Sequence, residues 1–140
     1  MMIGMQNGEP NQMLDVTEMK ERATRKVWMV LEELNEEYNA EFDFPRIEWV
    51  ICGSTAGKAW LGQWRIQLNE QLCKENMEDF MNDTIPHEVA HLVAYKVFGD
   101  DGHGQGWKSV MMALGLNPSR CHNYDTSKVD GKRSRNSMFR

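Results

Sequence analysis

The chain has 140 residues, a formal net charge of −5 and 41% hydrophobic residues, which predicts one globular domain with its own core. It contains no run of about 18 consecutive apolar residues, and its first residues lack the basic and apolar segments of a signal peptide. We therefore expect an intracellular, cytoplasmic protein without a membrane-spanning segment, acting as a monomer. Its three cysteines form no CxxC pair, which argues against a disulfide framework or a cysteine-based zinc knuckle.

Charge is distributed unevenly along the chain. Residues 1–101 contain 9 Lys and Arg against 19 Asp and Glu, whereas residues 102–140 contain 7 against 2. Because phosphate contacts depend on the local density of basic side chains, any DNA partner is expected at the C-terminal end, with salt-sensitive binding and an association with the nucleoid. The candidate contacts are Lys132, Arg133 and Arg135. A merely solubilising tail is the alternative.

The first half of the chain predicts one helix and a small sheet. Residues 1–12 show no periodicity and are expected to be a flexible tail. Apolar residues then recur every three or four positions over about 14–39, which predicts an amphipathic helix capped by Asp15 or Thr17. Three β-prone segments follow, the last two joined at Gly62-Gln63 as a tight hairpin. Together they predict an antiparallel sheet of about three strands, at about residues 46–52, 58–61 and 64–68.

The second half predicts helices. A first helical segment is expected to break at Asn82-Asp83, and a second should run over about 84–98. Pro86 suits its first turn, where a missing N–H is tolerated, and Gly99 suits its end. A last helix is predicted at about 105–114. The combination of these helices with a small sheet indicates an α+β fold.

The predicted helix over 84–98 contains the pattern HExxH. Residues four apart share one face of a helix, so His87 and His91 can direct two imidazoles at one zinc ion. Glu88, offset by about 100° around the axis, can accept a proton from a metal-bound water. A surface helix with two histidines by chance is the alternative reading. It is disfavoured by an apolar stripe made of Ile85, Val89, Leu92, Val93 and Val97.

A catalytic zinc usually has three protein ligands and one open position. His103, twelve residues after His91 in a glycine-flanked loop, is the best candidate for the third ligand, since that loop can fold back to the helix. The glycines at 102, 104 and 106 do not form a dinucleotide-binding loop, because they follow a helix where that fingerprint requires a strand.

The segments IQLNEQL, IPHEVAHLVAYKVFG, GHGQGWKSVM and NPSRCHNYD resemble the SprT-like family of zinc metalloproteases, which includes the Spartan proteases of DNA–protein crosslink repair. The combination of HExxH with a downstream His-Gly-x-x-Trp is more specific than HExxH alone. The resemblance covers about residues 14–125, so we expect a metalloprotease domain at 13–125 and a basic, disordered tail at 126–140. Bacterial SprT proteins usually carry a C-terminal zinc ribbon of paired cysteines, which this sequence does not contain.

The resemblance implies a zincin-like fold, a Zn²⁺ ion held by His87, His91 and His103, and Glu88 as general base. It also implies a protein substrate associated with or crosslinked to DNA. His122 matches a family position and is expected to contact substrate or the metal site's surroundings, or to be an ordinary structural histidine.

Aromatic residues near the predicted hairpin have two readings. Trp60 and Trp64 flank the turn and could contact a peptide, as an edge strand near zinc does in metalloproteases of this build, or stack on nucleobases. Core packing is the favoured reading, because half-buried strands favour aromatic residues. Trp107 is expected to pack the last helix under the His103 loop.

The leading hypothesis is therefore a zinc-dependent endopeptidase. The main alternative is a non-catalytic module that zinc only staples together and that its basic tail recruits to nucleic acid. Glu88 argues against this alternative, because a purely structural site needs no base beside the metal. A metallohydrolase with a small substrate is the third hypothesis, and an enclosed pocket would favour it.

Overall fold

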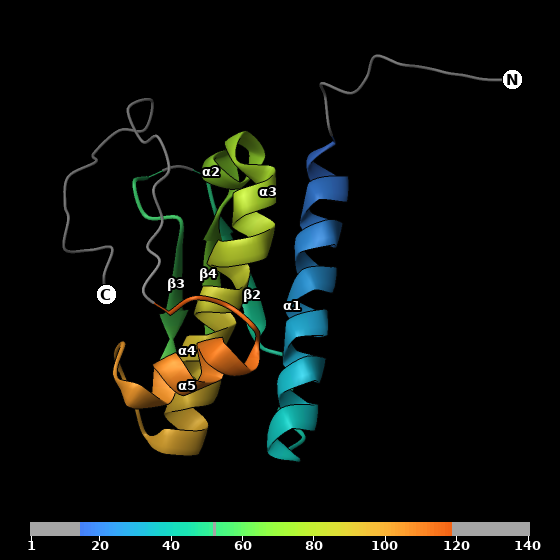
Figure 1. Ribbon diagram of the computed structural model, residues 1–140. Coiled ribbons are helices and arrows are strands. Elements are labelled where there is room, and N and C mark those ends of the chain that lie inside the picture. Colours follow the sequence, from blue (N-terminus) through green and yellow to red (C-terminus); the bar gives the residue numbers. More distant parts are fainter. Residues whose placement is uncertain (1–14, 52, 119–140) are drawn as a thin grey trace, which may run out of the picture.

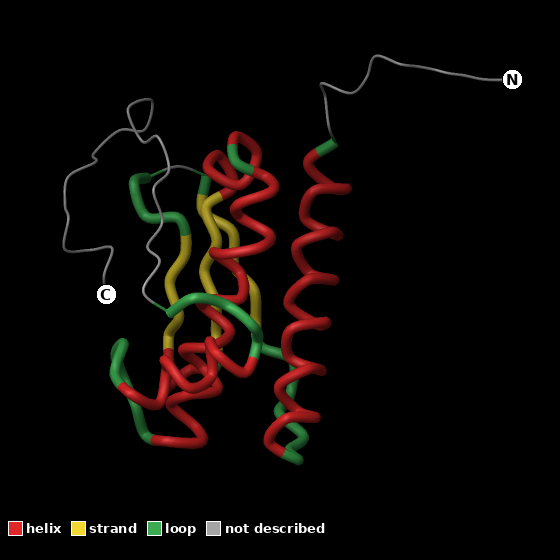
Figure 2. Tube along the Cα trace, viewed as in Figure 1, coloured by secondary structure: helices red, strands yellow, loops and turns green. Residues whose placement is uncertain are grey.

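The computed structural model describes residues 15–51 and 53–118, which form helices packed against a three-stranded sheet (Figures 1 and 2). The expected tails at 1–12 and 126–140 lie outside these residues. No helix of the described segments has the length and apolar character needed to cross a membrane. The elements in chain order are α1 (Val16–Tyr38), β2 (Arg46–Val50), β3 (Gly57–Trp60), η2 (Leu61–Gln63), β4 (Arg65–Asn69), α2 (Glu70–Glu75), α3 (Met77–Asp79), η3 (Phe80–Thr84), α4 (Ile85–Phe98) and α5 (Gln105–Ala113).

Helix α1 confirms the predicted amphipathic helix. It begins after Asp15, whose Oδ1 accepts a hydrogen bond from the backbone N–H of Thr17 at 3.3 Å, as an N-cap residue does. It ends at Asn39, which adopts the left-handed conformation with φ 52°. One stripe of the helix is buried, namely Met19, Ala23, Val27, Val30, Leu31 and Leu34.

The sheet is mixed, so the predicted antiparallel sheet is only partly right. Its strand order is β2-β4-β3, with β4 parallel to β2 and antiparallel to β3. Strand β4 lies at the centre and is the most buried of the three, with Ile66, Leu68 and Asn69 fully buried. Alternating hydrophobicity predicts which residues face the core, but it carries no information on strand order.

The connection between β3 and β4 is longer than the expected two-residue hairpin. The register pairs Trp60 with Arg65, so four residues make the turn, and η2 forms its first part. Trp64 closes the turn with φ 51°, a conformation that is uncommon for a non-glycine residue. Its indole Nε1 donates to the backbone oxygen of Asp43 at 2.7 Å, and its ring packs on Phe42. These contacts hold the unusual conformation in place.

The predicted break at Asn82-Asp83 is wrong. The chain continues from α3 into α4 through η3, a π-helical turn. This wide turn comes directly before Pro86, which lies in the first turn of α4 and cannot donate an ordinary helical hydrogen bond. A local π turn of this kind accommodates such an irregularity without ending the helix, and it is frequent beside functional sites.

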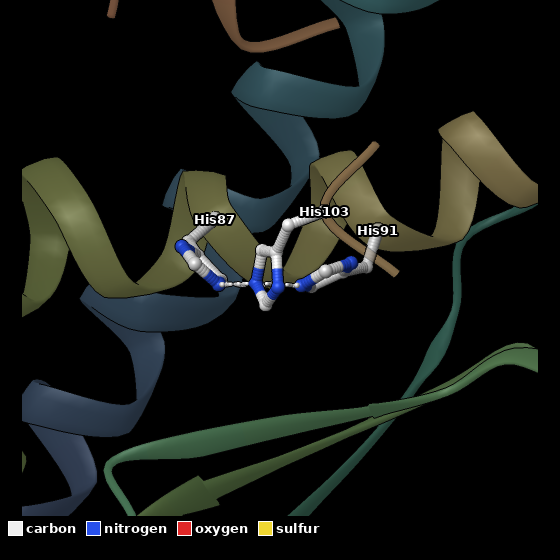
Figure 3. Close-up of side chains that lie close together, drawn as sticks. All are labelled: His87, His91 and His103. Carbon is white, nitrogen blue, oxygen red and sulfur yellow. Dashed lines mark hydrogen bonds between the residues drawn. The ribbon is translucent and has the colours of Figure 1, made fainter. Parts of the chain in front are cut away.

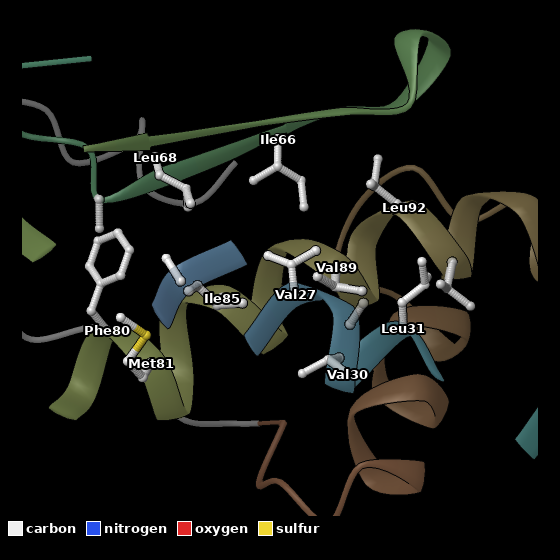
Figure 4. Close-up of a cluster of buried hydrophobic side chains, with 14 of the residues drawn as sticks. Val27, Val30, Leu31, Ile66, Leu68, Phe80, Met81, Ile85, Val89 and Leu92 are labelled. Atoms are coloured by element: carbon white, nitrogen blue, oxygen red, sulfur yellow. The ribbon is translucent and has the colours of Figure 1, made fainter. Parts of the chain in front are cut away.

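Helix α4 packs between the sheet, α1 and α5. Figure 4 shows Ile66 and Leu68 of β4 directed toward Val27 of α1 and toward Ile85 and Val89 of α4. The helix is buried from its start through Ala94 apart from the partly exposed His87, and Gly99 ends it with φ 72° as predicted. Val97 is 38% exposed, so its expected place in the apolar stripe is wrong. The core thus fixes the half of α4 that carries the HExxH motif.

Candidate metal centre

Two histidines of α4 point to the same place. His87 and His91 are one helical turn apart, and their Nε2 atoms are 3.2 Å from each other. His91 is buried, with 8% of its surface exposed, whereas His87 is partly exposed. The geometry follows from the four-residue spacing on a helix whose opposite side is anchored in the core.

His103 joins this pair from the loop between α4 and α5. Its Nε2 atom lies 3.1 Å from that of His91 and 3.3 Å from that of His87 (Figure 3). The structure thus brings together the three histidines that the sequence singled out, and they form a candidate metal site. The glycine-flanked loop does fold back on the helix.

The triangle of nitrogen atoms fits a tetrahedral metal ion. Zinc binds imidazole nitrogen at about 2.0–2.1 Å, so two such ligands in a tetrahedral site lie roughly 3.3 Å apart. The three observed separations of 3.1–3.3 Å match that spacing. Three imidazoles with an open fourth position are also a ligand set of catalytic zinc. Since imidazole suits other first-row divalent ions too, the geometry defines a metal site more firmly than the metal's identity.

Trp107 of α5 supports all three imidazoles. Only 2% of its surface is exposed. Its ring stacks on His91 and meets His87 and His103 edge-on, with centroid separations of 5.5, 5.0 and 4.6 Å. The expected position of Trp107 under the His103 loop is thus observed. A rigid ring on this side restricts how the imidazoles can rotate.

Glu88 of α4 is buried where this helix meets the start of β3. It is 4% exposed, and burial raises the pKa of its carboxyl group to about 8. A Cβ atom at Gly57 would lie 3.1 Å from Cγ and 3.4 Å from Oε2 of Glu88. The absence of a side chain at Gly57 therefore makes room for this carboxyl group. Gly57 lies just before the strand predicted at about 58–61, and no pattern in the sequence indicates this contact.

Asp100 is a second residue that sequence analysis missed. Its Oδ1 accepts the backbone N–H of Gly102 and its Oδ2 accepts that of Trp107, both at 2.9 Å. Hydrogen bonds from Trp107 and Gly102, with smaller contributions from the amides of Gly104 and Gly106, lower the pKa of Asp100. An aspartate two residues before a glycine is a turn signal, so the pattern Asp100-Asp101-Gly102 could have revealed the first of these contacts.

The two tryptophans proposed as substrate contacts take different positions. Side chains alternate between the two faces of a strand, so Gly57 and Ala59 of β3 share the face that meets Glu88. The side chain of Trp60 therefore lies on the opposite face. It lies between Lys58 and Arg65, whose charged groups are 4.2 and 4.5 Å from the ring centre.

Trp64 packs against the core beside Phe42, with the ammonium group of Lys96 5.3 Å from its ring centre. Lys96 is five residues beyond His91 on α4. Neither Trp60 nor Trp64 is among the side chains that the structure gathers at the histidine cluster.

The remaining candidate residues lie outside the described part of the chain. These are His122, Lys132, Arg133 and Arg135, so their predicted contacts with substrate and DNA stay predictions.

Cys73 lies in the described part of the chain and is fully buried, and burial raises the pKa of its thiol to about 12. Cys73 is therefore a core residue rather than a metal ligand.

A mixed α+β domain with three converging imidazoles and a buried glutamate in an HExxH helix defines a protein with a candidate HExxH metal-binding site. The model of the SprT-like family matches residues 28–126, and the chain belongs to this family.

Three relatives, each named protein SprT, show the extent of the similarity. The one from Pseudomonas putida strain F1 is 37% identical over 113 residues, or 79% of this chain and 69% of the relative. That from P. putida strain GB-1 is 40% identical over 94 residues, or 65% and 57%. That from Pasteurella multocida is 37% identical over 117 residues, or 82% and 71%. No solved structure matches the chain significantly.

Proposed function

We propose that this protein is a zinc-dependent endopeptidase with a zincin-like catalytic domain. The observation that carries the proposal is the convergence of three Nε2 atoms within 3.1–3.3 Å of one another, on a helix that also holds a buried glutamate. Membership of the SprT-like family supports it. His87, His91 and His103 would hold the ion, which supplies Lewis acidity and lowers the pKa of a bound water to near 7.

Glu88 is the proton carrier of the proposed reaction. Its carboxylate accepts a proton from the water that attacks the scissile carbonyl, and it then delivers this proton to the nitrogen of the leaving amine. Burial raises its pKa to about 8 in the metal-free protein, and a nearby cation lowers it again. A group with a pKa near the working pH is suited to both steps.

The non-catalytic alternative predicts a different site. A structural zinc ion has four protein ligands, whereas a catalytic one keeps a position open. Among the residues that the structure describes, the cluster offers three ligand atoms. The buried Glu88, next to His87 on the same helix, also has no role in a site that only stabilises the fold. Both features favour the enzyme.

The test is peptide-bond cleavage by the zinc-loaded protein and by a Glu88→Gln variant. The substitution keeps the shape of the side chain and all three histidines, so zinc binding should persist while cleavage falls by about 10²–10⁴-fold, the usual contribution of a general base. Glu78→Gln, which changes an exposed carboxylate on α3, is the matched control and should cleave as the wild type does. Equal cleavage by Glu88→Gln would refute the mechanism.

We further propose that the substrates are proteins bound or crosslinked to DNA, a proposal that rests on the family resemblance and on the basic C-terminal end. Cleavage of a DNA-binding protein should then increase when DNA is added, and the gain should shrink as salt rises. Removing residues 126–140 should reduce the gain. If the truncated and full-length chains respond to DNA equally, the tail has no part in recruitment.

A further inference from the structure

The loop from Gly99 to Gly104 carries His103 from α4 to its place beside the other two imidazoles. Histidines on a helix are positioned by the helix itself, but a loop residue needs other restraints. The side chain of Asp100 supplies two of them. One carboxylate oxygen accepts the amide of Gly102, just before His103, and the other accepts the amide of Trp107, just after the loop.

The second contact replaces an ordinary helix cap. Gly104 is the N-cap residue of α5 and has no side chain to accept a hydrogen bond. Trp107 is the third residue of that helix, and its amide is one that an N-cap side chain normally satisfies. Asp100 therefore caps α5 from four residues before the cap position. A negative charge there is also favoured by the dipole of α5.

Two glycines, at positions 104 and 106, leave room for the side chain of Asp100. A Cβ atom at Gly104 would lie 3.1 Å from Oδ2 of Asp100, and one at Gly106 would lie 2.9 Å from Cβ of Asp100 and 2.7 Å from Cβ of Phe98. Real Cβ atoms essentially never approach within 3.0 Å of such a neighbour. The loop can thus close this tightly only with glycine at position 106, and the glycine at position 104 leaves room for the carboxylate of Asp100.

We propose that Asp100 is a positioning residue for the metal centre: by holding the amides on both sides of His103, it fixes this third imidazole where the ion binds. Trp107 is fixed by the same carboxylate and touches all three imidazoles. Asp100 itself does not bind the ion. The inference rests on the proposed metal site and assigns a residue that its ligand motif does not contain.

The test measures Zn²⁺ affinity, by competition with a chromophoric chelator, for a double-mutant cycle of Asp100→Ala and His103→Ala. Loss of a residue that orients a metal ligand typically costs 10–100-fold in affinity, so we expect Asp100→Ala to weaken Zn²⁺ binding by about 10–100-fold. Because this effect acts through His103, the double variant should bind Zn²⁺ as His103→Ala does, within about twofold. Asp100→Asn, which keeps one acceptor oxygen, should lie between wild type and Asp100→Ala.

Two controls separate positioning from general stability. Asp101→Ala changes the adjacent exposed carboxylate and should leave the affinity unchanged. Near-ultraviolet circular dichroism of the metal-free variants checks that they fold, and Asp100→Asn takes the place of Asp100→Ala in the cycle if the alanine variant does not. The visible spectrum of the Co²⁺-loaded protein should change in the Asp100 variant, because the ligand geometry relaxes.

The Zn²⁺ affinities of these variants distinguish failure of the inference from failure of the proposed metal site. The inference is overturned if the Asp100 variant binds Zn²⁺ like the wild type while His103→Ala weakens binding. It is also overturned if the two effects multiply, since Asp100 would then act on the fold rather than through His103. If His103→Ala itself leaves Zn²⁺ affinity unchanged, the proposed metal site fails, and the inference fails with it.

Discussion

Burial of Glu88, the proposed general base, opposes the stability of the metal-free protein. Its carboxyl group is 4% exposed, and burial raises its pKa to about 8, well above the value of about 4.3 expected in an unfolded chain. The folded metal-free protein therefore holds this proton more tightly than the unfolded chain does. Between these two pKa values, stability falls as the pH rises.

A Glu88→Gln variant should remove this pH dependence. In the metal-free protein, the substitution should have little effect at pH 4 and should raise the free energy of unfolding at pH 8 by up to a few kcal/mol, because the amide needs no proton. Urea denaturation of chelator-treated protein at both pH values measures the difference. A variant that is equally or less stable than the wild type at pH 8 would show that burial does not disfavour the ionised form of Glu88.

The three candidate ligands differ in how far the sequence could predict their positions. His87 and His91 are four residues apart on a helix, so their relative position follows from local geometry. His103 lies in a loop, and its spacing alone does not say whether it turns toward the helix or away from it. In the folded chain, Asp100 accepts backbone amides on both sides of His103, and the ring of Trp107 lies edge-on to its imidazole.

At the scale of the elements, β3 approaches α4 closely at Gly57. Gly57 begins β3 directly against Glu88 and Thr84, where a Cβ atom would lie 3.1 Å from Glu88 Cγ and 3.2 Å from Thr84 Cγ2. The close approach of strand and helix brings the edge strand of the sheet beside the buried carboxyl group.

Gly57→Ala should therefore displace Glu88 or separate β3 from α4. We expect the free energy of unfolding to fall by about 1–3 kcal/mol, as is typical of overpacking, and cleavage to fall more than zinc affinity does. Gly62→Ala, at a position where a Cβ atom would meet nothing within 4 Å, is the matched control. Thermal denaturation and the cleavage assay measure both effects, and equal behaviour of the two variants would contradict the prediction.

Sequence patterns predicted element types better than element connections. The amphipathic repeat and Asp15 predicted α1 correctly, and Gly99 predicted the end of α4. The polar pair Asn82-Asp83 suggested a helix break, but packing of Phe80 and Thr84 in the core keeps the chain helical through a π turn. Such tertiary packing overrides local propensity.

At the scale of the whole molecule, the candidate metal site joins parts that are distant in the chain. Helix α4 lies against α1 and the sheet, while the His103 loop and α5 lie on α4. An ion bound to all three histidines would therefore tie α5 to the core as well as serve the reaction, and any ligand that binds only the folded state stabilises it.

Zinc should accordingly raise the melting temperature of the metal-free protein. At a free concentration 100 times the dissociation constant, binding adds about 2.7 kcal/mol, which corresponds to roughly 10 °C for a domain of this size. Mg²⁺, which prefers oxygen ligands, should have no effect, and His91→Ala should remove most of the shift. A wild-type melting temperature that does not respond to zinc would argue against the site.

The sequence by itself determined the long N-terminal helix, the HExxH helix and the shared face of His87 and His91, because those features depend on periodicity and on short spacings. Only the tertiary structure decided that β4 lies between β2 and β3, that Glu88 is buried against Gly57, and that Asp100 closes the loop around His103. These features depend on which distant segments pack together, and such packing reflects the shape and burial of the whole core rather than any local pattern.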